Sequence, residues 1–219
     1  MSPTRKAGNL LAGALSARPV ERDASDTAIL EATLRCLARY GMERMTVEDV
    51  ARTAGVGRAT VFRRFESKDD LIRQALAREL QRLVAEFGEK GGAIDDPLER
   101  LVELSVHTVG VIRTHPVARR LAEDDDALPL HRDPRLTQFQ LDGLRRYLDR
   151  TAADIGVSTD TESIAELLLR FFGSVWLAPE LGASLDDEAK VRRMITTLLA
   201  PLMPGFGPDA RSTVPTQFE

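Results

Sequence analysis

An all-α fold is expected for this chain of 219 residues, because three features of its sequence point to helices. Helix start signals recur, each pairing a short oxygen-bearing side chain with an acid in the first turn. Apolar residues follow these signals at spacings of three and four. No segment alternates apolar and polar residues for long, and no Asn-Gly hairpin signal occurs. The start signals are Thr46-x-x-Asp49, Ser67-x-x-Asp70, Asp96-Pro97-x-Glu99, Thr159-x-x-Glu162 and Ser184-x-x-Asp187.

About nine helices are predicted in chain order. Gly41 is expected to end the first helix, and Pro116 limits the fifth. The sixth is short, and the eighth is apolar over a wide arc. The expected ranges are about 24–40, 47–54, 58–64, 68–88, 97–114, 117–123, 134–153, 160–178 and 186–203.

Composition narrows the functional class. The single cysteine, Cys36, excludes an internal disulfide framework, and no apolar stretch reaches the roughly 18 residues of a membrane span. We therefore expect a cytoplasmic protein without a membrane partner. Motifs for catalysis or dinucleotide binding are missing, and the three histidines lack metal-ligand spacing, so no enzyme activity, cofactor or metal is expected.

Charge is distributed unevenly along the chain. The net charge is −4, but residues 1–68 hold 12 lysines and arginines against 8 aspartates and glutamates. A basic N-terminal third on an acidic body is typical of a protein that meets a polyanion at one end.

The segment 58–65 carries the clearest functional signal. On a helix, Val61 and Phe65 fall on one side and Ala59, Thr60 and Arg63 on the opposite side. Phe62 and Arg64 flank the outward side. A small-residue face with two guanidiniums suits a DNA groove, since arginine can pair with phosphates or form a fork onto guanine. The alternative is an arginine pair that only solvates an exposed face.

The connection 54–57, Ala-Gly-Val-Gly, is a tight turn between two short helices. Such a turn fits a helix-turn-helix unit, whose second helix enters the major groove. Combined with the cap at Thr46 and the Ser67-Lys68 pair, it favours DNA binding over the solvated-face alternative.

Four runs of residues form a recognisable pattern: Tyr40-Gly41-Met42, Met45-Thr46-Val47-Glu48-Asp49-Val50-Ala51, Ala54-Gly55-Val56-Gly57-Arg58-Ala59-Thr60-Val61-Phe62-Arg63-Arg64-Phe65 and Ser67-Lys68-Asp69-Asp70-Leu71. This pattern resembles the N-terminal domain of the TetR family of transcriptional regulators. The resemblance covers about residues 24–75; the rest matches only in length and helical content. It implies a homodimer that binds a palindromic operator on double-stranded DNA, usually represses, and is released by an unidentified small-molecule effector.

The resemblance also assigns residues. Thr46 is expected to cap the second helix and touch the DNA backbone, and Lys68 to hold a phosphate. Phe62 stands where the family commonly has tyrosine, so it either touches a thymine methyl or only packs. The residues expected to face DNA are Arg58, Ala59, Thr60, Arg63 and Arg64.

Four segments are expected. They are a flexible arm (1–21), a helix-turn-helix domain (22–67), a helical ligand-binding and dimerisation domain (68–204) and a flexible tail (205–219). Two apolar stripes on the eighth helix, joined by the ninth, favour a four-helix dimer interface, with a thick core inside one chain as the alternative. The expected interface residues are Leu168, Phe171, Phe172, Val175, Val191, Met194, Ile195 and Leu198.

The ligand site is expected to be mostly apolar, lined by His107, Phe139, Phe171 and Trp176. Two hypotheses of different class follow from the whole sequence. The first is a dimeric DNA-binding repressor switched by a small apolar ligand. The second is a helical enzyme or ligand carrier whose N-terminal unit is only a packing module. An activator would share the chemistry of the first.

Overall fold

The computed structural model describes residues 13–14, 23–124, 128, 131–182 and 184–202. The predicted tail, 205–219, lies outside these residues, as does the predicted arm apart from residues 13 and 14. Within the described residues the secondary structure is helical and contains no strand. The expected all-α fold, with nine α-helices in the described part of the chain, is therefore confirmed.

Three helices form an N-terminal head, the name used below for residues 24–64. They are α2 (Ala24–Arg44), α3 (Val47–Ala54) and α4 (Arg58–Arg64). The bounds of α3 and α4 agree with the sequence prediction.

Helix α2 is longer than predicted. It continues to Arg44 across a kink at Gly41, whose φ of 76° and ψ of 171° are not helical. Gly41 therefore bends the chain instead of ending the helix, because only glycine adopts this conformation at little cost.

The remaining helices form a body. They are α5 (Lys68–Gly92), α6 (Pro97–Thr114), α7 (Pro116–Glu123), α9 (Pro134–Asp154), α10 (Thr161–Leu177) and α11 (Glu188–Leu198), followed by a short 3-10 turn (Ala200–Leu202). Most begin at an aspartate or serine whose side chain accepts a hydrogen bond from the first turn, as at Ser67 and Asp96. Helix α7 begins instead at His115, whose ring accepts from the backbone N–H of Ala118.

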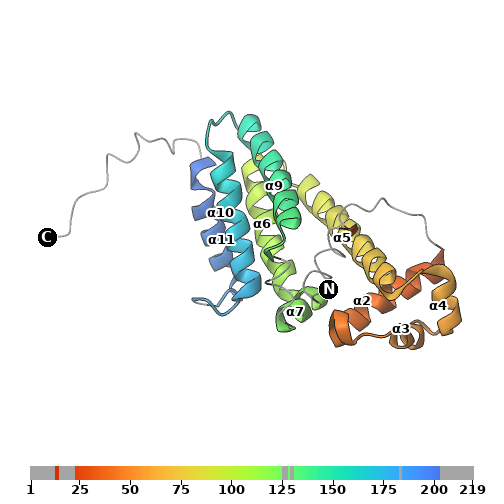
Figure 1. Ribbon diagram of the computed structural model, residues 1–219. Helices are drawn as coiled ribbons and strands as arrows, with labels where there is room; N and C mark the ends of the chain where they lie inside the picture. Colours follow the sequence, from red (N-terminus) through yellow and green to blue (C-terminus); the bar gives the residue numbers. More distant parts are fainter. Residues whose placement is uncertain (1–12, 15–22, 125–127, 129–130, 183, 203–219) are drawn as a thin grey trace, which may run out of the picture.

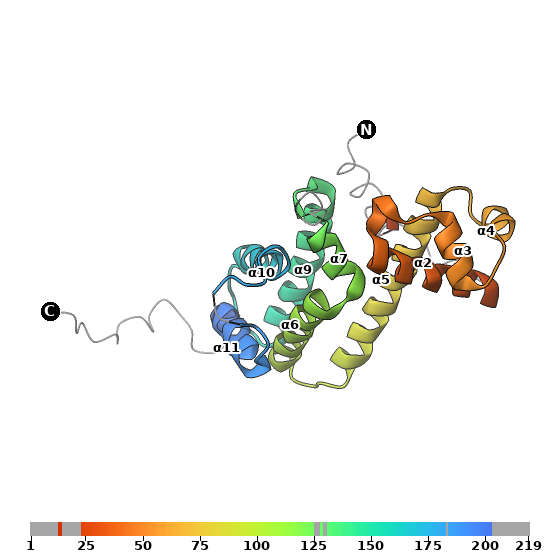
Figure 2. The same cartoon turned by 90° about the horizontal axis from the view of Figure 1, so that it is seen from below.

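The molecule is elongated, with the head at one end and α9, α10 and α11 at the other (Figure 1). Helix α5 leads out of the head toward the body, and α7 lies between α2 and the α6–α10 bundle (Figure 2). Helix α7 packs on α2, α6 and α10, so it contacts both ends of the molecule.

Two apolar cores hold this arrangement. The first joins the head to α5 and also includes Val117, Leu121 and Leu136 from α7 and α9. The second lies among α6, α9, α10 and α11, around Leu148, Leu168 and Ile195. Because the first core includes residues beyond position 68, head and body share buried apolar surface across the predicted boundary, which itself stays a prediction. Every helix in the described part of the chain is too short or too polar to cross a membrane.

Candidate nucleic-acid interface and ligand cavity

Helix α3 is fixed at its start by a reciprocal cap. The Asp49 backbone N–H donates to Thr46 Oγ1 at 3.1 Å, and the Thr46 N–H donates to Asp49 Oδ2 at 3.1 Å. The hydrogen bond from the Thr46 hydroxyl is the main reason that the pKa of Asp49 lies below its ordinary value. The predicted cap at Thr46 is therefore present, and its side chain remains exposed at the surface.

The turn after α3 depends on Gly55. Its φ of 70° is left-handed, and its N–H closes onto the carbonyls of Ala51 and Arg52. This geometry allows α4 to start three residues later, at Arg58.

Helix α4 is anchored from one side only. Val61 is 1% exposed and Phe65 is 2% exposed, and both pack in the first core. On the other side Ala59 and Arg63 are exposed, and Phe62 is 43% exposed. The division of this helix into a buried and an exposed side agrees with the sequence analysis. Arg63 makes no hydrogen bond or ion pair with any described residue.

Arg58 is exposed but engaged. Its guanidinium donates to Glu48 Oε1 at 2.5 Å and lies 5.3 Å from the centre of the Phe62 ring. An acid of α3 therefore faces the cation at the start of α4, and Phe62 lies beside that pair.

Arg64 differs from its neighbour Arg63. Its Nη1 lies 2.6 Å from Asp23 and 2.6 Å from Asp26, at the start of α2. The hydrogen bond from Arg64 is the main reason that the pKa of Asp23 is lowered. Arg64 therefore ties the end of α4 to the start of α2, and its predicted contact with DNA stays a prediction.

Lys68 occupies the first turn of α5, which is capped by the Ser67 hydroxyl. Its ammonium donates to the carbonyl of Glu43 at 2.9 Å. This contact holds the lysine beside the end of α2, on the head.

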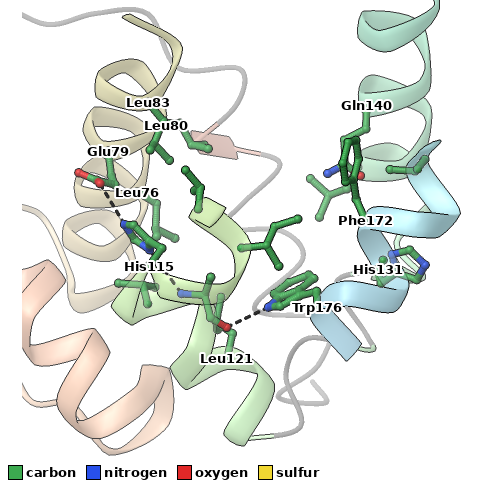
Figure 3. A pocket seen from close by; sticks show the side chains of 17 residues that line it. Leu76, Glu79, Leu80, Leu83, His115, Leu121, His131, Gln140, Phe172 and Trp176 are labelled. Carbon is green, nitrogen blue, oxygen red and sulfur yellow. Dashed lines mark hydrogen bonds and ion pairs between the residues drawn. The ribbon is translucent and has the colours of Figure 1, made fainter. Parts of the chain in front are cut away.

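A cavity of about 300 Å³ lies in the body, among α5, α6, α7, α9 and α10. Most of its lining is apolar, and the polar lining residues are Glu79, His115, His131 and Gln140. Figure 3 shows Glu79 and His115 on one side of the space, and Gln140, His131 and Phe172 on the other. Trp176 lies between them and donates its indole N–H to the carbonyl of Ala118 at 2.9 Å.

Glu79 is the carboxylate of this lining and is nearly buried. Burial by itself raises the pKa of Glu79, but hydrogen bonds from Arg82 and His115 outweigh it and hold the pKa below the ordinary value. Arg82 Nη2 lies 2.7 Å from Oε1, and His115 Nε2 lies 3.0 Å from the same oxygen. Because His115 Nδ1 accepts from Ala118, its Nε2 carries the proton that bonds Glu79.

The structure does not bring together the residues predicted to line a ligand site. Trp176 lines the cavity, whereas His107, Phe139 and Phe171 do not. His107 packs edge-on against Phe87 and lies 3.1 Å from Glu86, Phe139 is about half exposed, and Phe171 packs against the second core.

Sequence reasoning missed Glu79, His115, His131 and Phe172 in the lining. No local signal marks these residues, because they come from α5, the junction of α6 and α7, the segment before α9, and α10, and meet only in the folded chain. The single exception is the cap of α7, since a histidine directly before Pro116 stands at a helix start.

The predicted interface residues also lie in different environments. Leu168, Val175, Val191 and Ile195 are covered by the chain itself and belong to the second core. Phe172 faces the cavity. Met194 is exposed, and Phe171 and Leu198 are half-buried. Leu167, which was not among the predicted residues, is 50% exposed on α10.

Comparison with known proteins matches the head most directly. A family model described as bacterial regulatory proteins, tetR family, matches residues 29–75. An uncharacterized HTH-type transcriptional regulator of Mycobacterium tuberculosis is 36% identical over 85 residues, which cover 39% of this chain and 41% of that protein. This chain thus spans less than half the length of that relative.

Two longer matches extend into the body. A second uncharacterized HTH-type transcriptional regulator of Mycobacterium tuberculosis is 28% identical over 194 residues, covering 87% of this chain and 80% of that protein. The crystal structure of FadR from Bacillus subtilis in complex with stearoyl-CoA is similar with a TM-score of 0.58 at 13% identity, covering 83% of this chain and 99% of that one. At such low identity the likeness concerns the fold alone.

Proposed function

Since this chain belongs to the TetR family of bacterial regulatory proteins, we propose that it is a transcriptional repressor that reads duplex DNA with α4. The observation that carries the proposal is the outward side of α4. Arg63 stands there exposed and makes no hydrogen bond or ion pair within the described part of the chain, while Val61 and Phe65 anchor the helix from behind. A short helix fixed in this way can enter the major groove.

The residues of this surface take different roles. Arg63 reaches base edges, and Ala59 and Thr60 allow close approach to the groove. Thr46 and Lys68 meet phosphates on either side of the groove. Phe62, exposed beside Arg58, touches a thymine methyl in this proposal.

The other two arginines of α4, Arg58 and Arg64, are paired with acids of the chain. Arg58 exchanges Glu48 for DNA when the complex forms, which is possible because both side chains are exposed. Arg64 keeps Asp23 and Asp26 and acts as a positioning residue that fixes the direction of α4.

The repressor is further proposed to be a homodimer bound to a palindromic operator, with half-sites about 34–36 Å apart or a multiple of this spacing. The apolar side chains that remain available on α10 and α11 support this arrangement. They are Leu167, Phe171, Met194 and Leu198. Each belongs to a helix at the outer end of the body, away from the head (Figure 1).

Release by a small, mostly apolar ligand completes the proposal. Helix α7 supports it, because Val117, Ala118 and Leu121 line the cavity while Asp124, at the end of the same helix, accepts from Arg44 of α2 at 3.0 Å. A ligand that favours another position of α7 therefore changes the population of the DNA-binding arrangement of the head. The stearoyl-CoA complex of the Bacillus subtilis relative is a further reason to expect a ligand in the body.

The test is selection of bound sequences from random duplex DNA, followed by titration of the selected duplex with Arg63→Ala. We expect the variant to lose about 1–3 kcal/mol of specific binding, since one side chain that pairs with a base edge is removed. Arg146→Ala, an exposed arginine of α9, is the matched control and should bind like the parent. Failure of the parent chain to bind any duplex at low salt would instead favour a ligand-binding protein or enzyme in which the head is a packing module.

A further inference from the structure

The charges around the cavity are balanced. No lysine or arginine lines it, and Glu79 is its one carboxylate among the described residues. Arg82 lies outside the lining, but three of its donor contacts, at 2.7–3.1 Å, reach the two oxygens of Glu79. The carboxylate therefore has a permanent counter-charge, and the lining as a whole offers no unbalanced charge to a ligand.

His115 adds to this balance. One ring nitrogen bonds Glu79 and the other accepts from the backbone of Ala118. Both nitrogens are occupied, so His115 is not available to a ligand as a cation without breaking the cap of α7. The remaining polar groups, His131 and Gln140, lie on the opposite side of the cavity (Figure 3). Neither side chain has a hydrogen-bond partner among the described residues.

A charged ligand group placed in such a lining loses its water without gaining an opposite charge, which is costly. A neutral hydroxyl or carbonyl loses much less and can be satisfied by His131 or Gln140.

From this we propose that the cavity selects uncharged, largely apolar molecules with a neutral polar end, and rejects alkyl carboxylates and alkylammonium ions of the same length. The charge balance between Glu79 and Arg82 is the determinant of this selection. The inference rests on the proposed function only in taking the cavity as the ligand site.

The test uses three probes with one ten-carbon chain: decan-1-ol, decanoate and decylammonium. At pH 7.5 the second and third are ionised, as carboxyl and amino side chains are at that pH. Trp176 is the only tryptophan of the chain and lines the cavity, so its fluorescence reports occupancy without DNA. We expect the alcohol to bind at least about tenfold more tightly than either ion.

Two variants should shift this preference in opposite directions. Glu79→Gln removes the one carboxylate of the described lining, while Arg82 keeps only Glu86 as a counter-charge, at 2.9 Å, so decanoate should gain affinity relative to the alcohol. Arg82→Gln leaves Glu79 unbalanced, so decylammonium should gain instead. Glu89→Gln, on the exposed side of the same helix α5, is the control and should preserve the order of the parent.

Equal binding of the three probes to the parent would mean that the polar end stays in solvent, and it would overturn the proposal. Unchanged order in both variants would also overturn it, since the pair would then not be the determinant. Thermal melting of each variant shows that it is folded before titration. Because no DNA is present, a failed repressor hypothesis and a failed ligand selection give separate results.

Discussion

Helix α4 presents its outward side chains within seven residues, whereas the cavity takes its lining from five helices, α5, α6, α7, α9 and α10. The outward side of α4 needs only a capped turn before it and two apolar anchors, Val61 and Phe65, behind it. The cavity needs residues from Leu76 to Trp176 to meet at one place.

The two regions also treat charge differently. On the head, Arg63 is exposed and pairs with none of the residues that the structure describes, and Arg58 is paired across an exposed surface with Glu48. In the cavity, Glu79 is nearly buried and bonded by Arg82 and His115. The charge proposed to meet DNA is thus accessible, while the charge that borders the apolar cavity is neutralised within the chain.

The largest effect is expected where the two regions join. Gly41 has a φ of 76°, and a Cβ at this position would collide with the Asp124 carboxylate of α7. We expect Gly41→Ala to lower the free energy of unfolding by about 1–3 kcal/mol through backbone strain alone, with a further loss from the collision. Urea denaturation measures the sum.

Gly156→Ala separates the two contributions. Gly156 also has a left-handed φ, of 70°, but no atom stands near the added Cβ. Its loss should be smaller than that of Gly41→Ala, and adding Asp124→Ala to Gly41→Ala should recover the difference. Equal losses at the two glycines would mean that the Asp124 side chain yields to the added Cβ without cost, so that Gly41 is needed only for its backbone conformation.

The different construction of the two regions explains what the sequence could predict. The cap at Thr46 and the turn at Gly55 depend on neighbours within four residues, and the buried and exposed sides of α4 follow from helical spacing. All three were predicted. Arg64 was predicted to face DNA together with Arg63. Its ion pair with Asp23 was not predicted, because that partner lies 41 residues away and leaves no local signal.

The body shows more clearly what could not be predicted from the sequence. Periodicity gave the bounds of α6 and α9 within a residue, but it could not say whether an apolar residue faces the core, the cavity or solvent. Leu168, Phe172 and Met194 were all assigned to one interface, and the structure places them in these three environments in turn.

A smaller effect is expected in the cavity, from Glu79→Gln. The pKa of Glu79 is lowered in the folded protein, so its ionised form stabilises the fold above the ordinary pKa of 4.5, and this contribution is lost as the pH falls. The variant should be less stable than the parent by about 1–2 kcal/mol at neutral pH, because charge-assisted hydrogen bonds are weakened. Below about pH 4.5 the difference should shrink.

Chemical denaturation at a series of pH values measures that difference directly. Glu89→Gln supplies the comparison, since its carboxyl is exposed and should give no comparable dependence. A loss for Glu79→Gln that is the same at pH 7 and pH 3.5 would mean that shape, and not charge, is what the site requires, and the contrast with the head would weaken.

The smallest effect is expected on the head, from Glu48→Gln. Glu48 pairs with Arg58 on the exposed surface, where such pairs contribute little to stability. Its charge also repels phosphate. Removing it should therefore leave the melting temperature nearly unchanged and raise the affinity for random duplex roughly two- to fivefold at low salt. Fluorescence anisotropy with labelled DNA measures this, with Glu162→Gln on the distant α10 as the control.

The same variant decides what Glu48 does in the specific complex. If it only restrains Arg58, affinity for the selected operator should rise along with that for random duplex, and specificity should fall slightly. If its carboxylate instead accepts from the amino group of a cytosine, the selected operator should bind more weakly while random duplex still gains. The second result would give the acid of α3 a share in sequence reading. The head would then resemble the cavity in having its charges balanced, which the exposed Arg63 alone does not suggest.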